Sequence, residues 1–293
     1  LFIAAGAESM SRAPFVIAKS ESPYSREFRA FDSTIGARFP NPKVEKQYGD
    51  DTMPQTADNV AADLGISRAE ADTYAARSQA LYEKARAEGF FDAEIHPVEV
   101  SQGRKKPAKL VDKDEHPRPD SDLAALSGLR PLFEGGVVTA GNASGVNDGA
   151  AALILGSEAI GQTYGVKPRG RILAGAVSGV EPRVMGLGPV EACKKALARA
   201  GLSLEQMDVI EINEAFASQV LGCCKQLGIA FDDQRLNPNG GAIAVGHPLG
   251  ASGARLTLTA LRQLERTGKR YALVSLCIGL GQGVAAVIER LDA

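Results

Sequence analysis

The sequence lacks the marks of a nucleic-acid-binding or membrane protein. Its 33 Lys and Arg residues nearly balance 35 Asp and Glu residues, and the formal net charge is −2. Such a balance gives no indication of a polyanionic partner. No stretch approaches the roughly 20 apolar residues of a membrane span, and no signal-peptide pattern is present. We therefore expect no nucleic acid and no membrane among its partners.

Cysteine is scarce and irregularly spaced. There are four cysteines, and two of them, Cys223 and Cys224, are adjacent. This number and spacing match neither a disulfide framework nor a zinc site. Cys193, Cys223 and Cys224 lie inside helical patterns, where core packing explains them. We expect no metal and a reducing, cytoplasmic location.

Apolar strands alternate with helical patterns in the second half of the chain. Strands are predicted over 149–155, which we expect to be buried, and over 171–178; a helix begins after Ser157 and another spans 191–200. Alternation of this kind favours an α/β fold with helices on both faces of a sheet. The chain is long enough for one large or two medium domains.

Residues 15–135 differ in character from the rest, mixing proline and charged residues with short helices. Helices are predicted over 56–64 and 68–89, the second starting at a capping box of Ser67 and Glu70, and a strand over 94–100. The basic cluster Arg104, Lys105, Lys106 and Lys109 has two interpretations, a solvated hairpin tip or a site that attracts phosphates. His96 and His116 are interpreted as structural or solvent-facing.

The glycine-rich stretch 237–255 is the first candidate for chemistry. It holds five glycines and places His247 directly before Pro248. Glycine permits tight turns and close backbone approach, and proline stiffens the chain. A helix is predicted from Ser252 to Arg266. The loop is typical of one that holds an imidazole at a fixed place for acid–base chemistry.

Two further segments place polar groups at strand ends. Residues 271–289 predict a β-hairpin with a glycine-rich connection, and Cys277 lies where its first strand ends. An apolar strand at 209–212 ends in Asn213 and Glu214 and is followed by a helical pattern. An imidazole, a thiol and an amide thus fall at strand ends or loops, where α/β proteins carry their chemistry.

Five segments, spread from the start of the chain to its end, resemble signature blocks of the thiolases. In chain order they are Glu8-Ser-Met-Ser-Arg-Ala-Pro14, Val138-Thr-Ala-Gly-Asn-Ala-Ser-Gly-Val-Asn-Asp-Gly-Ala150, Asn213-Glu-Ala-Phe-Ala217, Gly240-Gly-Ala-Ile-Ala-Val-Gly-His-Pro-Leu-Gly-Ala-Ser-Gly253 and Cys277-Ile-Gly-Leu-Gly-Gln-Gly283.

The resemblance implies a layered αβαβα thiolase fold with mixed five-stranded sheets. Residues 1–14 and 136–165 would then be the remainder of an incomplete N-terminal half. Residues 15–135 would form an inserted loop domain that covers the substrate and binds coenzyme A, and residues 166–293 the C-terminal half. Acyl-CoA and coenzyme A are the expected partners, with coenzyme A a co-substrate and no covalently bound cofactor. A full-length member is expected to be a homodimer or homotetramer.

Site residues follow from the same resemblance. His247 would take the proton of a nucleophilic thiol, and Cys277 would exchange a proton with the acetyl-CoA enolate, its pKa tuned by a neighbour. Asn213, through an ordered water, and the Gly279 N–H would stabilise oxyanions. Arg118, Phe133, Ser144 and Phe216 are the expected substrate and coenzyme A contacts. Leu280, where many relatives carry glycine, is expected to narrow the acyl pocket.

The thiolase nucleophile has no counterpart in these 293 residues. Leu1 begins an apolar strand without a preceding Met, and in the family the nucleophilic cysteine lies upstream of this point. Cys193, Cys223 and Cys224 are wrongly placed to replace it. We therefore expect the chain alone to form no acyl-enzyme. A non-catalytic fragment that binds acyl-CoA is the alternative of another class.

The acyl group is predicted from several shorter stretches. These stretches are residues 48–54, 114–119, 182–189 and 277–283. They are most similar to the 3-oxoadipyl-CoA thiolases, which cleave their substrate with coenzyme A to form succinyl-CoA and acetyl-CoA. A general 3-ketoacyl-CoA or acetoacetyl-CoA thiolase is the alternative.

Overall fold

The computed structural model describes residues 1–36 and 38–291, so residues 292 and 293, the end of the predicted C-terminal half, lie outside the described residues. Its larger sheet has the strand order β7-β10-β9-β8, formed by β7 (Gly170–Gly179), β10 (Gln282–Arg290), β9 (Tyr271–Ile278) and β8 (Val209–Ile212). β8 runs parallel to β9, and the other neighbours are antiparallel. The predicted hairpin at 271–289 is confirmed.

Among the described residues this sheet has four strands, whereas five were expected. The position beside β8 is occupied by a single bridge, in which Ile210 N donates to Arg235 O and Asn237 N donates to Ile210 O. The ladder stops there because Asn237 has a φ of 42° and the next residue, Pro238, has no N–H. The fifth segment is therefore present but too short to form a strand.

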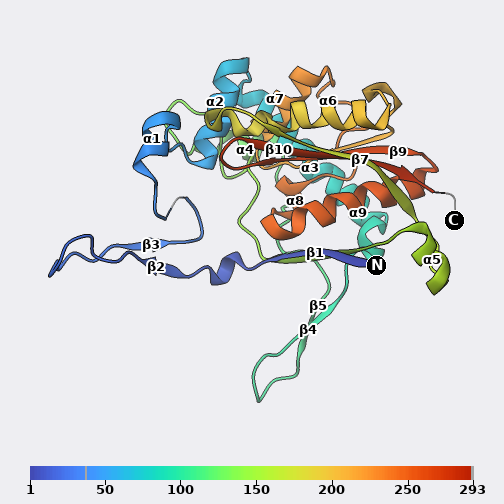
Figure 1. The fold of residues 1–293 in the computed structure, drawn as a ribbon, viewed down its shortest axis with the longest axis horizontal. Coiled ribbons are helices and arrows are strands. Elements are labelled where there is room, and N and C mark those ends of the chain that lie inside the picture. The colour runs from blue at the N-terminus through green and yellow to red at the C-terminus, as the bar shows by residue number, and fades with distance from the viewer. Residues whose placement is uncertain (37, 292–293) are drawn as a thin grey trace.

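Helices cover both faces of the sheet, as predicted (Figure 1). On one face lie α6 (Gly188–Ala200) and α7 (Ala217–Leu227), and on the other α9 (Leu249–Thr267). Leu256 and Leu264 of α9 pack against Val209 and Val274 of the sheet. Helix α9 begins three residues before the predicted Ser252, because Pro248 O already accepts from Ala251 N and Ser252 N.

A second, two-stranded sheet lies on the far side of α9 and adds another layer (Figure 1). It pairs β1 (Phe2–Glu8) with β6 (Gly149–Leu155) in antiparallel register. A Cβ at Gly6 would lie 1.7 Å from Gly250 O, so the helix reaches the strand only because glycine stands there. The prediction that β6 is buried was wrong: α9 covers one face only, and Ile154 is 71% exposed.

The region 15–135 contains two of the longer helices, two short helices and two small hairpins. Both α2 and α3 start at capping boxes, Thr52 with Gln55 and the predicted Ser67 with Glu70, and each such cap contributes about 1 kcal/mol. The elements of this region are β2 (Phe15–Ile17), β3 (Ala30–Asp32), α1 (Pro42–Tyr48), α2 (Met53–Leu64), α3 (Arg68–Ala87), β4 (Val98–Val100), β5 (Lys109–Val111) and α4 (Leu123–Ser127). The strand predicted from residue 94 begins only at Val98, after Pro97.

Shorter elements connect these layers. They are the helices α5 (Glu158–Tyr164) and α8 (Ala242–Val245) and the 3₁₀ turns η1 (Met10–Arg12), η2 (Phe90–Ala93), η3 (Pro182–Leu187) and η4 (Leu204–Gln206). Ser157 caps α5 by accepting from Ile160 N, as the sequence predicted. None of the helices in the described ranges combines the length and apolar character that crossing a membrane requires.

Candidate functional site

His247 is held by a loop that only glycine can form. Gly246 has a φ of +94°, and a Cβ on it would lie 2.3 Å from Asn147 Oδ1. The same oxygen accepts a hydrogen bond from His247 N at 3.1 Å. Asn147, just before β6, thus fixes the backbone from which the imidazole projects.

The imidazole lies between two polar side chains. Its Nε2 is 3.2 Å from Asn213 Nδ2, and its Nδ1 is 2.6 Å from Ser252 Oγ. The Ser252 hydroxyl donates to Pro248 O at 2.9 Å, so Nδ1 carries the hydrogen and donates to Ser252. Nε2 then accepts from the Asn213 amide, and it is the nitrogen able to take a proton.

The structure therefore brings together two predicted site residues, His247 and Asn213, in direct contact. Sequence reasoning had placed a water beside Asn213 and had not singled out Ser252 or Asn147. Ser252 stands on the first turn of α9, whereas His247 lies in the loop before that helix, so no spacing rule could have found their contact. Asn213 Oδ1 is buried without a hydrogen-bond partner, so the amide has an acceptor left over for a ligand or water.

Burial, and to a smaller extent the nearby positive charge of Arg255, lower the pKa of His247 to about 4. Both effects act against the imidazolium form. At neutral pH the ring is uncharged, which is the state that a general base needs.

The positive charge of Arg255 is expected to hold the pKa of His247 down. Replacing Arg255 by glutamine removes a positive charge that opposes protonation, so the pKa of His247 should rise from about 4 toward the ordinary value of about 6.5. An NMR titration of the imidazole between pH 3 and pH 8 measures this. His116 is the internal control, because burial and Arg118, not Arg255, lower its pKa. A His247 titration that does not move would contradict the effect of Arg255.

Cys277 lies at the end of β9, opposite Gly283 of β10. It packs against a small apolar cluster that includes Met185, Ala215 and Phe216. Burial raises the pKa of Cys277 to about 12, so at neutral pH the group is a thiol and a proton donor rather than a thiolate. The expectation that a neighbour brings this pKa near neutrality is not met within the described residues.

The turn after Cys277 contains the other two residues predicted there. A Cβ on Gly279 would stand 3.6 Å from Met53 Sδ, so this residue lies beside the start of α2. Leu280 has a φ of 66° and a side chain that is 77% exposed. It does not join the Cys277 cluster, and a narrowing of the acyl pocket by Leu280 remains a prediction.

The remaining three cysteines are core residues, as predicted. Cys193, Cys223 and Cys224 are fully buried. Burial raises the pKa of Cys193 to about 11 and that of Cys224 to about 12, and it raises that of Cys223 well above its usual value. None of the three is therefore poised as a thiolate.

Two of the four expected coenzyme A contacts, Ser144 and Phe216, lie side by side. A backbone bridge joins Ala143 to Phe216, and Ser144 N donates to Ala215 O at 3.0 Å. These residues therefore place Ser144 beside the Cys277 cluster. The Arg118 guanidinium donates to the carbonyls of Glu115, His116 and Pro117 in its own loop, and that loop lies against Gly145, where a Cβ would stand 2.3 Å from His116 Cε1.

Phe133 lines a separate hollow of about 510 Å³ beside α2. Its wall includes the acidic residues Asp51, Asp58 and Glu134, and Arg118 is not part of it. Ser144 and Phe216 do not line this hollow either. The sequence could not show this, because the loops that carry Arg118 and Phe133 have no strand or long helix to fix their spacing.

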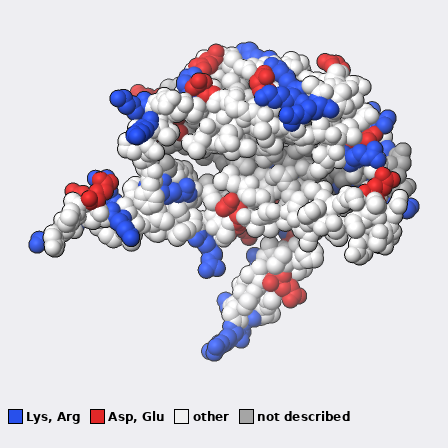
Figure 2. Space-filling view, in the orientation of Figure 1, with Lys and Arg blue, Asp and Glu red and all other residues white. Residues whose placement is uncertain are grey.

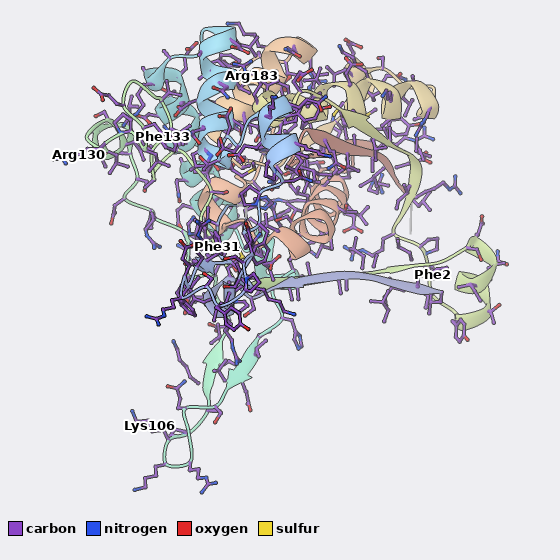
Figure 3. The ribbon with its side chains drawn as sticks, turned by 60° about the vertical axis from the view of Figure 1, so that its left-hand side comes forward. Phe2, Phe31, Lys106, Arg130, Phe133 and Arg183 are labelled. Carbon is purple, nitrogen blue, oxygen red and sulfur yellow. The ribbon has the colours of Figure 1, made fainter. Side chains whose placement is uncertain are left out.

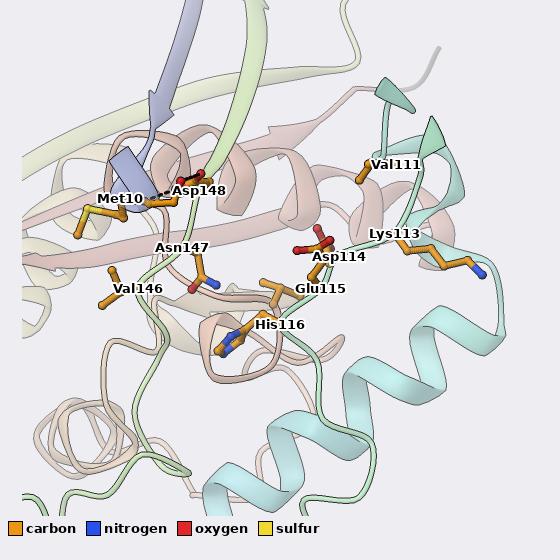
Figure 4. Close-up of a pocket in the computed structure, with 11 residues that line it drawn as sticks. Met10, Val111, Lys113, Asp114, Glu115, His116, Val146, Asn147 and Asp148 are labelled. Atoms are coloured by element: carbon orange, nitrogen blue, oxygen red, sulfur yellow. Dashed lines mark hydrogen bonds between the residues drawn. The ribbon is translucent and has the colours of Figure 1, made fainter. Parts of the chain in front are cut away.

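A second hollow, of about 490 Å³, lies beside the His247 loop (Figure 4). Asn147, which holds the His247 backbone, forms part of its wall, together with Asp114, His116 and Asp148. His116, interpreted from sequence as structural or solvent-facing, is half-buried here. The hollow gives an approach to the His247 loop from solvent.

The basic cluster lies on the β4–β5 hairpin, which projects away from the body of the protein (Figures 1 and 2). Lys106 stands at its far tip (Figure 3). The hairpin tip predicted from sequence is confirmed in its geometry, while an attraction for phosphates remains a prediction.

Comparison with known proteins covers both halves of the chain. The family model for the N-terminal domain of thiolase matches residues 1–159, and that for the C-terminal domain matches residues 166–290. A Pseudomonas aeruginosa protein named beta-ketoadipyl-CoA thiolase is 56% identical over 292 residues, which is 99% of this chain and 72% of that protein. An Escherichia coli protein named 3-oxoadipyl-CoA/3-oxo-5,6-dehydrosuberyl-CoA thiolase is 55% identical, covering 99% of this chain and 73% of that protein.

A solved structure agrees with these matches. The crystal structure of human mitochondrial 3-ketoacyl-CoA thiolase in complex with CoA superposes with a TM-score of 0.89 and 41% sequence identity. The superposition covers 99% of this chain and 70% of the human one. The fold, the two family models and the relatives agree, and the chain belongs to the thiolase family.

Proposed function

We propose that the protein, together with the nucleophilic cysteine that the family resemblance implies and that these 293 residues lack, is an acyltransferase that cleaves a 3-oxoacyl-CoA with coenzyme A. We propose 3-oxoadipyl-CoA as its substrate. The observation that carries the reaction is the neutral imidazole of His247, held between Asn213 and Ser252 with an unprotonated Nε2. A thiol nucleophile requires such a base, since only the thiolate attacks efficiently.

The reaction begins when Nε2 of His247 accepts the proton of a cysteine thiol, as the family resemblance implies. The thiolate attacks the C3 ketone, the bond between C2 and C3 breaks, and its electron pair leaves on acetyl-CoA as the enolate. The Cys277 thiol gives its proton to the enolate carbon. The thiol of coenzyme A then attacks the acyl thioester, which frees the cysteine and releases the shortened acyl-CoA.

Oxyanions form in both halves of this reaction and need hydrogen-bond donors. The Asn213 amide, already within 3.2 Å of the imidazole, is proposed as one donor, and the Gly279 N–H as another. Ser144 and Phe216, beside the Cys277 cluster, are proposed to contact the pantetheine arm and the acyl group. For Arg118 and Phe133 a coenzyme A contact remains a prediction, as does assembly into dimers or tetramers.

Two relatives named for 3-oxoadipyl-CoA cleavage share more than half of their aligned residues with this chain, and this supports the narrower substrate. A general 3-ketoacyl-CoA thiolase is the second candidate, favoured by the 41% identity to the human enzyme of that name.

The two candidates differ in rate on a dicarboxylic substrate. We expect kcat/KM for 3-oxoadipyl-CoA to exceed that for acetoacetyl-CoA at least about tenfold, since a site built for a carboxylate discriminates against a methyl group. Loss of the 3-oxoacyl-CoA absorbance measures both rates under the same conditions. Equal rates would leave only the general activity, and coenzyme A binding by calorimetry without cleavage would indicate a non-catalytic acyl-CoA-binding protein.

A further inference from the structure

Glu214, the residue after Asn213, is fully buried and accepts four hydrogen bonds. Its Oε1 accepts from Tyr74 Oη and from Asn237 Nδ2, each at 3.0 Å. Its Oε2 accepts from Ser78 Oγ at 2.6 Å and from Ile243 N at 3.1 Å. Every partner donates, and each oxygen has two donors, which is the full complement of a carboxylate.

These donors belong to segments far apart in the sequence. Tyr74 and Ser78 lie one turn apart on α3, and Ile243 lies in α8, four residues before His247. Gly241 N donates to Ser78 Oγ at 3.1 Å. A Cβ on Gly241 would stand 2.4 Å from the carboxyl carbon of Glu214, so the loop lies directly against the carboxylate.

The remaining donor connects the same carboxylate to the end of β8. Asn237 Oδ1 accepts from Ile212 N, and Asn237 Nδ2 donates to Ile212 O, both at 2.9 Å. Glu214 therefore joins three parts of the site: the strand end that carries Asn213, the loop that leads to His247, and helix α3 beneath both. It does so without touching the imidazole.

We propose that Glu214 is a positioning residue that sets the place of His247 relative to Asn213. The inference rests on the proposed function, in which the contact between Asn213 Nδ2 and His247 Nε2 belongs to the reacting centre. Displacement of a reacting group by about 1 Å can lower a rate about 100-fold, and the four hydrogen bonds of Glu214 oppose such a displacement.

Glu214→Gln tests this with almost no change in volume. The new amide must direct its NH₂ either at Ile243 N–H, a backbone donor that cannot reverse, or at the Asn237 amide, whose orientation Ile212 fixes. Either way two donors face each other. We expect kcat for thiolysis to fall about 100-fold with KM within about twofold, and the His247 imidazole NMR signals to shift.

Glu211→Gln is the matched control. Glu211 is also a fully buried glutamate at this end of β8, but neither of its carboxylate oxygens has a hydrogen-bond partner. Burial raises its pKa to about 8, so at pH 7 its protonated form is nearly isosteric with glutamine. We expect its kcat and the His247 signals to match those of the unmodified protein.

Two further variants keep the test decisive if Glu214→Gln does not fold. Tyr74→Phe and Ser78→Ala each remove one donor to Glu214, and each should lower kcat about tenfold with a smaller shift of the His247 signals. Unchanged kcat and unchanged His247 signals in the variants that fold would overturn the proposal. If the unmodified protein shows no thiolysis when the segment with its nucleophilic cysteine is present, the proposed function fails, while the His247 signals still decide whether Glu214 positions the ring.

Discussion

His247→Ala is expected to lower kcat for thiolysis about 10³-fold, the middle of the range for loss of a positioned general base. The effect should be large because no other described group is so placed: Nε2 lies 3.2 Å from the Asn213 amide, and the ring is neutral with a pKa of about 4. Coenzyme A affinity should change little, since the imidazole serves the reacting atoms. Steady-state kinetics and calorimetry measure the two quantities separately.

His96→Ala is the control for this variant. His96 is exposed and precedes Pro97 outside both hollows, so its loss should leave kcat unchanged within about twofold. A His247→Ala protein that keeps kcat within tenfold of the unmodified protein would show that another group activates the nucleophile.

Cys277→Ala is expected to lower kcat about 10²- to 10³-fold, again as loss of a proton-transfer group. Burial holds Cys277 as a thiol with a pKa of about 12, and the proposed enolate cannot become acetyl-CoA without a proton. Acylation of the enzyme should be slowed less than release of acetyl-CoA, because reversal of the carbon–carbon cleavage competes with the missing proton transfer. Rapid-quench measurement of both species distinguishes the two steps.

The comparison for Cys277 is Cys193→Ala, which removes another buried thiol, in helix α6 and outside the site. That variant should lose stability, as a shortened core residue does, while its kcat stays within about twofold. Equal losses of kcat in the two variants would mean that Cys277 acts only through packing.

Secondary structure was predictable where the sequence fixes local geometry. One or two residues determine the boundary of an element in several places, and the structure confirms these predicted boundaries. They are the caps at Ser67 and Ser157, the glycines around the β9–β10 turn and the apolar strand before Asn213. The solvent exposure of β6 was not predictable, because the sequence pattern of an apolar strand does not show whether other elements cover one of its faces or both. The short length of the fifth segment was not predictable either, since its pairing with β8 ends where Asn237 adopts a positive φ.

The candidate site was predictable as a set of residue types but not as a network. His247 and Asn213 stand out as an imidazole and an amide at loop and strand ends, and the structure joins them. Ser252, Arg255 and Glu214 act through contacts with residues distant along the chain or one helical turn away, and a single sequence gives no measure of these contacts. The low pKa of His247 likewise depends on burial, which is a property of the folded state.

The most direct test of the proposed function is cleavage of 3-oxoadipyl-CoA with coenzyme A in D₂O, with products identified by mass spectrometry. The mechanism predicts two coenzyme A thioesters, succinyl-CoA and acetyl-CoA, with at least one deuterium in the acetyl methyl group, delivered from the exchanged Cys277 thiol. Free 3-oxoadipate with coenzyme A would instead show thioester hydrolysis. That result, or acetyl-CoA without deuterium, would contradict the thiolase mechanism described here.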